Sequence, residues 1–409
     1  MIVKPVSRII QELDAKSFTV IGCPGADGLG SGALQTFHAA LTGAEGDFIV
    51  VLGDIAPLGR DPFYRGVADF VDRATAKSVH VMRGNHDGPD YEEIFGLADR
   101  AIISEDFLLI MLDNSQRRFS DDSLKFLGET MALVDSQNVV VAFHVPPPNR
   151  FTGHSMSVGE WRRFEDAVGV WRNRISLLLC SHSHSYFEDE VDGLRLVVTG
   201  GGGARIHHVD RVARPEHHAL EISFDGEGEP AVGFRRLGRD HGDIPECALD
   251  GLRRLYAEQC RQRVELVLQA EEADELGAFN LARLYRAAAG SCLHQARFLY
   301  SLLRGGGSSP ARDAEDRLRE GVLRLEKDDA LVAGCADILA ESAAFEASTA
   351  HRAFLGLLDR AVVTLSEKDD IGEALYHVCQ SCGMLTAGSE SPTYCAACGA
   401  PGHFINETH

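Results

Sequence analysis

The sequence lacks several features that would assign it at once to a large class of proteins. No apolar run approaches the roughly 18 residues that a membrane-spanning helix needs, and residues 1–5 do not open the apolar core of a secretory leader. Positive charge is also scarce, since 40 Lys and Arg residues face 61 Asp and Glu residues and the formal net charge is -21. This balance argues against binding nucleic acid through its phosphates. We therefore expect a cytoplasmic protein that binds neither membranes nor nucleic acid.

The cysteines do not have the arrangement of a secreted disulfide framework, which belongs to much shorter chains. Six of the ten cysteines are scattered along the chain, as free thiols of a reducing compartment are. The other four form two Cys-x-x-Cys pairs near the C-terminus, Cys379 with Cys382 and Cys395 with Cys398. This spacing predicts a tetrahedral four-thiolate site for Zn or Fe.

Eight short apolar runs in the first part of the chain end in glycine or polar residues. They cover residues 18–22, 48–53, 78–84, 107–113, 139–144, 175–180, 194–200 and 219–224. Val, Ile and Leu occupy odd and even positions of these runs, which is typical of strands covered on both faces. Because helix-like stretches separate the first of them, we predict an α/β layered domain over residues 1–240. In such domains functional groups gather beyond the strand ends.

Side chains suited to binding metal ions follow these runs. They are Cys23, Asp54, Asn85, His86, Asp87, His144, His182 and His184. A single histidine at a strand end is more often a cap or a surface residue, but histidines after three separate strands favour a shared site. Carboxylate, amide and imidazole ligands together favour a divalent transition metal such as Mn, Fe, Zn or Ni.

The order of these motifs resembles that of the calcineurin-like metallophosphoesterases over about the first half of the chain. The motifs are Gly53-Asp54, Gly84-Asn85-His86-Asp87, His144 and His182-Ser183-His184. The resemblance implies a two-sheet sandwich flanked by helices, with Asp54 bridging two metal ions. It also implies that Asn85, His144 and His182 complete one metal position and that His184 belongs to the other. His86, held by Asp87, would donate a proton to the leaving group or bind the phosphoryl oxygens.

The chain departs from that family after the first strand, where the usual Asp-x-His is replaced by Cys23-Pro24-Gly25. Three interpretations stay open: a single-metal enzyme, a two-metal site with Cys23 as an unusual ligand, and a decayed site. We expect one tightly held metal ion, because Gly25 offers no ligand. Asp27 could substitute, although a role in its turn is favoured. The histidine pairs at 207–208 and 217–218 are predicted to lie in solvated loops.

Beyond residue 245 the strand-like runs disappear, and residues 246–368 show helical spacing of Ala and Leu. Ser291 and His294 recur 57 residues later as Ser348 and His351 (291 to 348), which predicts two hairpins of a four-helix bundle. A bundle followed by a ribbon at 374–406 resembles rubrerythrin. Rubrerythrins bind di-iron through Glu-x-x-His, and serine replaces both of those glutamates, so we expect no working iron site. The bundle is also where a homodimer would form.

Three functional hypotheses follow. The first is a metal-dependent phosphoesterase that hydrolyses a phosphate mono- or diester by attack of metal-bound hydroxide. The second is a non-catalytic sensor or scaffold that binds a phosphorylated ligand, and the third is a redox protein of oxidative stress that works through its ribbon. The metal-ligand residues favour the first hypothesis, Gly25 favours the second, and the two serines argue against the third.

Overall fold

The computed structural model describes residues 1–135, 138–207, 216–224, 229–237, 246–303 and 375–408. The chain forms two units, Met1–Leu29 with Ala33–Gly238 and Gly30–Gly32 with Arg239–His409. None of the described helices combines the length and the apolar character that crossing a membrane requires.

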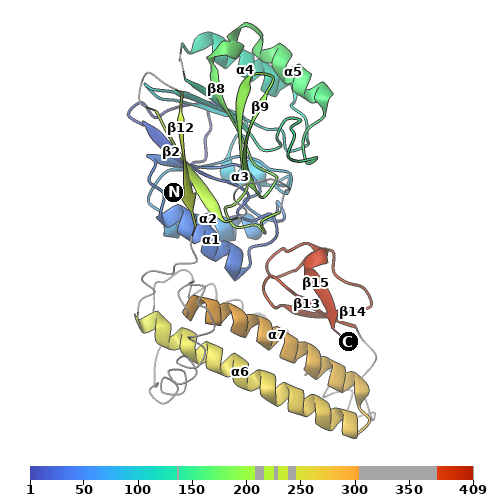
Figure 1. The fold of residues 1–409 in the computed structure, drawn as a ribbon. Helices are drawn as coiled ribbons and strands as arrows, with labels where there is room; N and C mark the ends of the chain where they lie inside the picture. Colours follow the sequence, from blue (N-terminus) through green and yellow to red (C-terminus); the bar gives the residue numbers. More distant parts are fainter. Residues whose placement is uncertain (136–137, 208–215, 225–228, 238–245, 304–374, 409) are drawn as a thin grey trace. The chain divides into compact units, whose positions relative to one another are not determined.

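The first unit is a sandwich of two β-sheets (Figure 1). The larger sheet has the strand order β1-β5-β6-β7-β8-β10-β9, and the smaller has the order β12-β11-β2-β3-β4. The strands are β1 (Ile9–Gln11), β2 (Ser17–Ile21), β3 (Phe48–Val51), β4 (Val79–Val81), β5 (Arg100–Ile103), β6 (Leu108–Leu112), β7 (Val139–Phe143), β8 (Ile175–Cys180), β9 (Tyr186–Val191), β10 (Leu194–Thr199), β11 (His218–Ser223) and β12 (Ala231–Arg236). Strands β2, β3 and β4 pair in parallel, and so do β6, β7 and β8, so each group presents its carboxyl ends at one edge.

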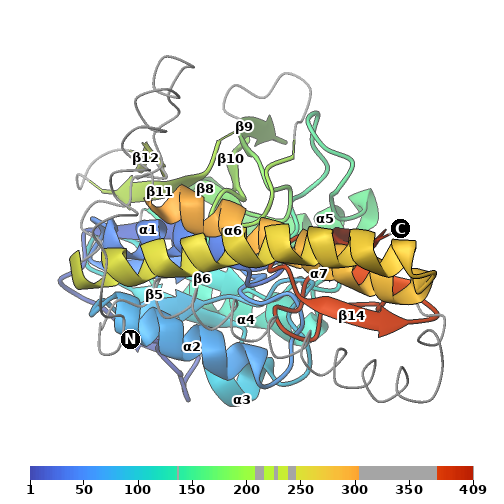
Figure 2. The ribbon, with the colours of Figure 1, turned by 90° about the horizontal axis from the view of Figure 1, so that it is seen from below.

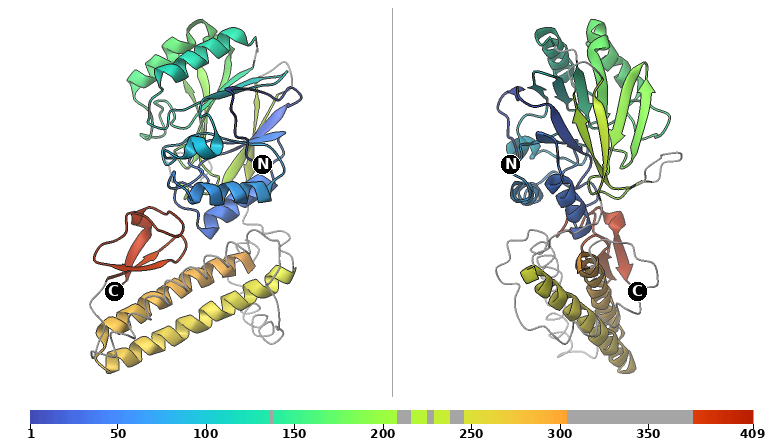
Figure 3. Two further views of the ribbon diagram at one scale, coloured as in Figure 1. Left: turned by 180° about the vertical axis from the view of Figure 1, so that it is seen from behind. Right: turned by 60° about the vertical axis from the view of Figure 1, so that its left-hand side comes forward.

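Helices cover the outer faces of the sandwich (Figure 3). They are α1 (Ser31–Thr42), α2 (Phe63–Ala74), α3 (Tyr91–Phe95), α4 (Asp121–Leu133), α5 (Val158–Val168) and the 3-10 helix η1 (Gly169–Arg174). Successive side chains of a strand point to opposite faces, so Leu109 and Met111 of β6 pack between the sheets. Leu108 and Ile110 of the same strand pack in the outer cluster with Phe126 of α4. Burial on both faces explains why β6 is apolar at every position.

Each of the eight predicted runs contains a strand, which confirms the mixed α/β layering. Sequence analysis missed β1, β5, β9 and β12. Strand β9 has the sequence Tyr-Phe-Glu-Asp-Glu-Val and lies at the edge of the larger sheet. Because β9 has only one neighbouring strand and its side chains are partly exposed, it does not need a continuous run of apolar residues. Apolar content alone therefore could not identify this strand.

The second unit contains a helical hairpin and a small ribbon. Helices α6 (Glu246–Glu275) and α7 (Phe279–Leu303) run side by side (Figure 2). The ribbon has the strands β13 (Leu375–Cys379), β14 (Leu385–Gly388) and β15 (Ile405–Thr408) in the order β14-β13-β15, with the 3-10 helix η2 (Gly402–Phe404). Leu284 and Ala288 of α7 pack with Tyr376 and Val378 of β13 in one apolar cluster. The expected second hairpin, with Ser348 and His351, lies outside the described residues.

Candidate metal centre

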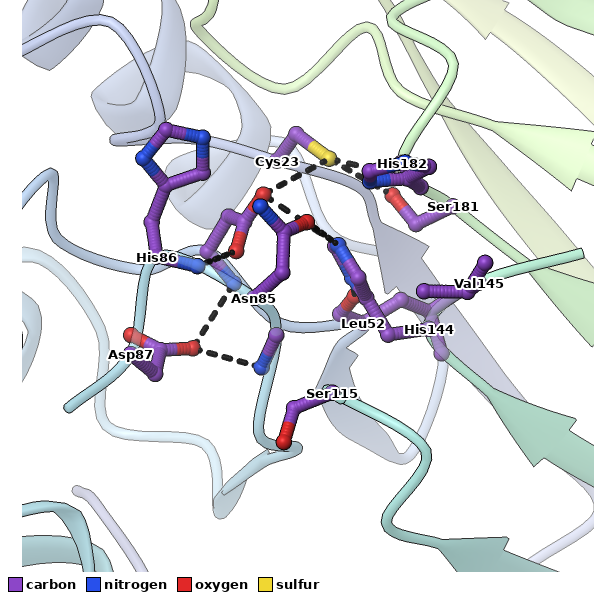
Figure 4. Close-up of polar contacts among 12 residues, drawn as sticks. Cys23, Leu52, Asn85, His86, Asp87, Ser115, His144, Val145, Ser181 and His182 are labelled. Atoms are coloured by element: carbon purple, nitrogen blue, oxygen red, sulfur yellow. Dashed lines mark hydrogen bonds and ion pairs between the residues drawn. The ribbon is translucent and has the colours of Figure 1, made fainter. Parts of the chain in front are cut away.

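Polar side chains that follow five different strands meet at one edge of the sandwich (Figure 4). Their potential ligand atoms form two groups, and within each group the atoms lie within 4.8 Å of one another. The cysteine triad consists of Cys23, Asp54 and His184, and the histidine triad consists of Asp54, His144 and His182. Asp54 belongs to both triads, which is the arrangement expected of a carboxylate that bridges two ion positions.

The backbone is strained where it presents these ligands. Of the six non-glycine residues with positive φ in the described part of the chain, four are Cys23 (47°), Asp54 (53°), His182 (68°) and His184 (40°). Such conformations cost roughly 1–3 kcal/mol each for L-residues and cluster at functional sites. Four ligand candidates sharing this conformation therefore favour a functional over a purely structural origin.

The histidine triad places one ring nitrogen of His144 close to two side-chain oxygen atoms. His144 donates its Nδ1–H to the Leu52 carbonyl at 2.7 Å, which leaves Nε2 facing Asp54 Oδ2 at 3.2 Å and Asn85 Oδ1 at 3.0 Å. Burial would lower the pKa of His144, but the Asp54 carboxylate raises it above its ordinary value. The site therefore calls for a positive charge between these atoms, and either a proton or a metal ion would supply it.

The other two imidazoles are suited to act as neutral ligands. Burial lowers the pKa of His182 to about 3 and that of His184 to about 4. His184 Nδ1 lies 3.2 Å from the Arg205 carbonyl and 3.8 Å from Asp27 Oδ2. This contact fixes the proton on Nδ1 and leaves Nε2 free for a cation, as outer partners of metal-binding histidines commonly do. Asp27, for which sequence favoured a turn role, also accepts the Arg205 N–H at 2.7 Å.

Cys23 is a fully buried thiol that points toward the shared carboxylate. Its Sγ lies 4.0 Å from Asp54 Oδ2 and 3.0 Å from Ser181 Oγ, and it accepts the His182 N–H at 3.3 Å. Burial and the charge of Asp54 raise the pKa of Cys23 well above its ordinary value. The thiol therefore keeps its proton at neutral pH unless a cation replaces that proton. The donors of both triads fit divalent transition metals, with the sulfur favouring Zn or Fe at the cysteine triad.

The missing first-strand histidine has a steric explanation at Gly25. A Cβ added there would come within 2.2 Å of the Ile55 carbonyl oxygen and 2.7 Å of the Ile55 carbonyl carbon, both backbone atoms. The Gly25 N–H also donates to the Asp54 carbonyl at 2.9 Å, which holds the two loops together. The path of the chain therefore leaves no room for a histidine ligand at this position.

Asp87 has partners different from those expected. Its Oδ2 accepts the N–H groups of Gly84 at 2.7 Å and Asp54 at 2.8 Å, and its Oδ1 accepts from the Tyr64 hydroxyl at 3.2 Å. The His86 ring points away from Asp87 (Figure 4). Burial and then the charge of Asp54 raise the pKa of Asp87 to about 7. In this structure Asp87 fixes the two loops that carry Asp54 and Asn85, and it does not orient His86.

His86 is half-buried, and its ring lies beside the cluster (Figure 4). Its backbone N–H donates to Asp54 Oδ1 at 2.8 Å, so the same turn supports the bridging carboxylate and displays the imidazole. No partner of the His86 ring is found within the described parts of the chain. The ring is thus free to contact a substrate.

Three further histidines near this edge were assigned to loops or left open. His218 is buried in β11, with Nε2 2.8 Å from Thr199 Oγ1, so the solvated-loop prediction is wrong for this residue. His207 is exposed, as predicted, and its ring lies 4.6 Å from that of His184 between centroids. The exposed His154 lies 6.1 Å from His182 by the same measure. Sequence could place neither beside a ligand, because each comes from a separate loop.

The four ribbon cysteines form a second candidate metal site. Cys379 Sγ lies 3.8 Å from Cys398 Sγ, and Cys382 Sγ lies 3.7 Å from Cys395 Sγ. Sulfur atoms about 2.3 Å from a tetrahedral ion lie about 3.8 Å apart, whereas disulfide sulfurs are about 2.05 Å apart. The four thiols therefore match a tetrahedral metal ion rather than two disulfides.

The serine that replaces the expected glutamate of α7 has a structural contact. Ser291 Oγ donates to the Gly383 carbonyl at 2.5 Å, in the turn that follows Cys382. The neighbouring His294 is largely buried, which lowers its pKa. In the described hairpin these positions therefore secure the ribbon against the helix.

A known family model matches part of the first unit. Residues 16–186 match the family model described as calcineurin-like phosphoesterase. No curated protein sequence matches the chain.

Three solved structures show the range of similar folds. GAP50, the anchor in the inner membrane complex of Plasmodium, is 11% identical with a TM-score of 0.41 and covers 55% of this chain and 89% of its own. A putative 5'-nucleotidase from Staphylococcus aureus is 13% identical with a TM-score of 0.35 and covers 55% and 54%. Fully reduced nigerythrin is 16% identical with a TM-score of 0.29 and covers 41% and 90%. These TM-scores are too low for the similarities to support an argument.

Proposed function

We propose that this protein, whose residues 16–186 match the calcineurin-like phosphoesterase family model, hydrolyses phosphoesters with the help of divalent metal ions. The observation that carries the proposal is the sharing of Asp54 by two triads of ligand residues, all of which are buried except the partly exposed His182. Divalent ions bound there would neutralise phosphoryl charge and provide a reactive water at neutral pH.

The chain's own residues divide the remaining work. Asp54, Asn85, His144 and His182 would hold one ion, and Cys23, Asp54 and His184 would hold the other. Asp87 holds the loops after β3 and β4 together by accepting hydrogen bonds from the Gly84 and Asp54 N–H groups. His86 is the proton donor to the leaving group, because its half-buried ring is unpartnered among the described residues and its backbone N–H contacts Asp54.

A hydrolysis assay tests this function directly. Native protein is assayed with p-nitrophenyl phosphate and bis-p-nitrophenyl phosphate in the presence of Mn, Fe, Zn or Ni. We expect Asp54→Ala to abolish metal-dependent turnover and His86→Ala to lower kcat/KM by roughly 10²- to 10⁴-fold, the range of a lost general acid. Lys125→Ala, on the exposed side of α4, should match native protein. Turnover that is insensitive to both site variants would refute the proposal.

A phospholigand sensor without turnover is the second candidate, and Gly25 is the observation that favours it. The missing histidine leaves the cysteine triad with fewer ligands than the family pattern provides. The same assay separates the two functions, because a sensor would bind inorganic phosphate in calorimetry without hydrolysing either ester.

We also propose that the second unit is a metal-stabilised module of the rubrerythrin type. The four ribbon thiols hold Zn or Fe, and the Ser291 contact joins the ribbon to α7. Absorption spectroscopy tests the metal, because oxidised Fe bound by four thiolates is red and Zn is colourless.

A further inference from the structure

Arg117 lies at the edge of the histidine triad, on a loop that sequence analysis did not single out. Its guanidinium Nη2 is 3.3 Å from His182 Nε2, and its Nη1 donates to the Ser155 carbonyl at 3.4 Å. The side chain is exposed. Arg117 is thus the basic side chain in direct contact with a proposed ligand of the metal centre, within the described part of the chain.

Hydrogen bonds that connect the turn of Arg117 to the loop after β7 fix the position of Arg117. The Arg117 N–H donates to the Asn114 carbonyl at 2.8 Å and closes a turn in which Arg117 has a φ of 59°. The fully buried Asn114 side chain donates to the Val145 carbonyl at 2.7 Å and accepts the Val145 N–H at 2.9 Å. Val145 directly follows His144, so the turn is attached to the loop that supplies a ligand. Because the backbone of Arg117 is strained and its turn is anchored, its side chain is already positioned to bind a partner.

Electrostatics indicates what that partner is. No carboxylate of the described residues lies within ion-pair distance of Arg117, although acidic residues outnumber basic ones by 61 to 40. A guanidinium beside a site for divalent cations is repelled by them unless an anion lies between the charges. Guanidinium groups recognise phosphoryl oxygens through paired hydrogen bonds.

We infer that Arg117 binds the phosphoryl oxygens of the substrate and makes the site selective for phosphomonoesters. This inference rests on the proposed phosphoesterase function. A monoester phosphoryl group carries up to two negative charges and three terminal oxygens, whereas a diester carries one charge and two such oxygens. The guanidinium therefore stabilises the monoester more strongly, and the exposed His154 beside His182 is placed to contact the same group.

Calorimetry with inorganic phosphate tests the binding role apart from turnover. In metal-loaded full-length protein we expect Arg117→Ala to weaken phosphate binding by roughly 10- to 100-fold, the usual value of a charge-assisted hydrogen bond. Arg117→Gln keeps donors for His182 and Ser155 but loses the charge, so it should resemble Arg117→Ala. Arg117→Lys should recover part of the affinity. Arg118→Ala, the exposed neighbouring arginine, should bind phosphate as native protein does.

Hydrolysis of the two esters tests the selectivity. Arg117→Ala should lower kcat/KM for p-nitrophenyl phosphate by about 100-fold and for bis-p-nitrophenyl phosphate by about 10-fold or less, within the same range of interaction strengths. Equal losses on both esters would overturn the assignment of a monoester substrate. Full phosphate affinity in Arg117→Gln would mean that Arg117 only positions His182.

The outcomes also separate this inference from the proposed function. Arg117-dependent phosphate binding without hydrolysis of either ester would refute the phosphoesterase and retain the anion site. Hydrolysis together with phosphate binding that is the same in Arg117→Ala and Arg118→Ala would retain the phosphoesterase and refute the role of Arg117. Native metal-loaded protein that binds no phosphate would overturn the inference outright.

Discussion

Replacing Asp87 distinguishes two roles for a carboxylate next to His86, the proposed proton donor. In Asp87→Ala, the buried N–H groups of Gly84 and Asp54 lose their shared acceptor. Each unsatisfied group costs about 1–3 kcal/mol, so the free energy of unfolding should fall by about 2–6 kcal/mol. For a unit of this size the melting temperature should drop by roughly 5–20 °C. Differential scanning calorimetry measures that drop.

The matched variants make the result specific. Asp87→Asn keeps one oxygen that can accept both N–H groups and loses only the charge, so we expect a cost of about 1–2 kcal/mol. His86→Ala removes a half-buried ring without a partner and should change the free energy of unfolding by about 0.5 kcal/mol or less. The affinity for Mn or Zn should fall with Asp87→Ala and stay constant with His86→Ala, because only Asp87 holds the backbone of Asp54.

A double-mutant cycle on kcat/KM gives the result that would refute this reasoning. If Asp87 worked by orienting His86, adding Asp87→Asn to His86→Ala would cause no further loss. If Asp87 holds the loops, the losses of the two variants multiply. A melting temperature unchanged in Asp87→Ala, together with a fully non-additive cycle, would restore the role that the sequence suggested.

Three further predictions concern other parts of the molecule. Gly25→Ala should lower the melting temperature and the metal content through its clash with the Ile55 carbonyl, whereas Gly66→Ala, with open space at its Cβ, should be neutral or stabilising by up to about 1 kcal/mol. Burial lowers the pKa of His80 to about 3, whereas an unfolded histidine has a pKa of about 6.5. The free energy of unfolding should therefore be unaffected by His80 above about pH 6.5 and should fall by about 3 kcal/mol between that pH and pH 4. Acid unfolding of His80→Leu should lack that loss. Chelation of the ribbon metal, or Cys395→Ser, should release one ion and increase amide exchange in α7, which hydrogen-exchange mass spectrometry follows.

The sequence predicted eight of the strands of the first unit and placed the candidate ligands after them for a common reason. Strands buried on both faces must be apolar throughout, and the parallel strands β2 to β4 and β6 to β8 deliver the residues that follow them to one edge. Position after a strand therefore located Asp54, Asn85 and His144 without any tertiary information. The same rule fails for short or edge strands such as β1 and β9, which need less apolar sequence.

Sequence could not predict the direction in which a side chain turns after its strand ends. Asp87 is adjacent to His86, and adjacency suggested a hydrogen bond, yet three donors from elsewhere occupy the carboxylate. Arg117 escaped notice because nothing in its local sequence signals a turn attached to Val145. His218 was assigned to a loop because the predicted run began at Ala219, whereas β11 begins one residue earlier, at His218.

The two proposed ion positions differ because Cys23 carries a thiol proton and because no side chain fits at Gly25. The histidine triad gains Asn85 as a fourth donor, and burial holds its His182 imidazole neutral, so His144 is the member of this triad whose proton a cation replaces. The cysteine triad has three donors, one of which is a thiol with a raised pKa, and Gly25 has no space for another ligand. A cation enters that triad only by displacing the thiol proton, which favours Zn or Fe over Mg or Mn. We therefore expect the asymmetry of the first-strand motif to make the histidine triad the tighter position and the cysteine triad selective for softer ions.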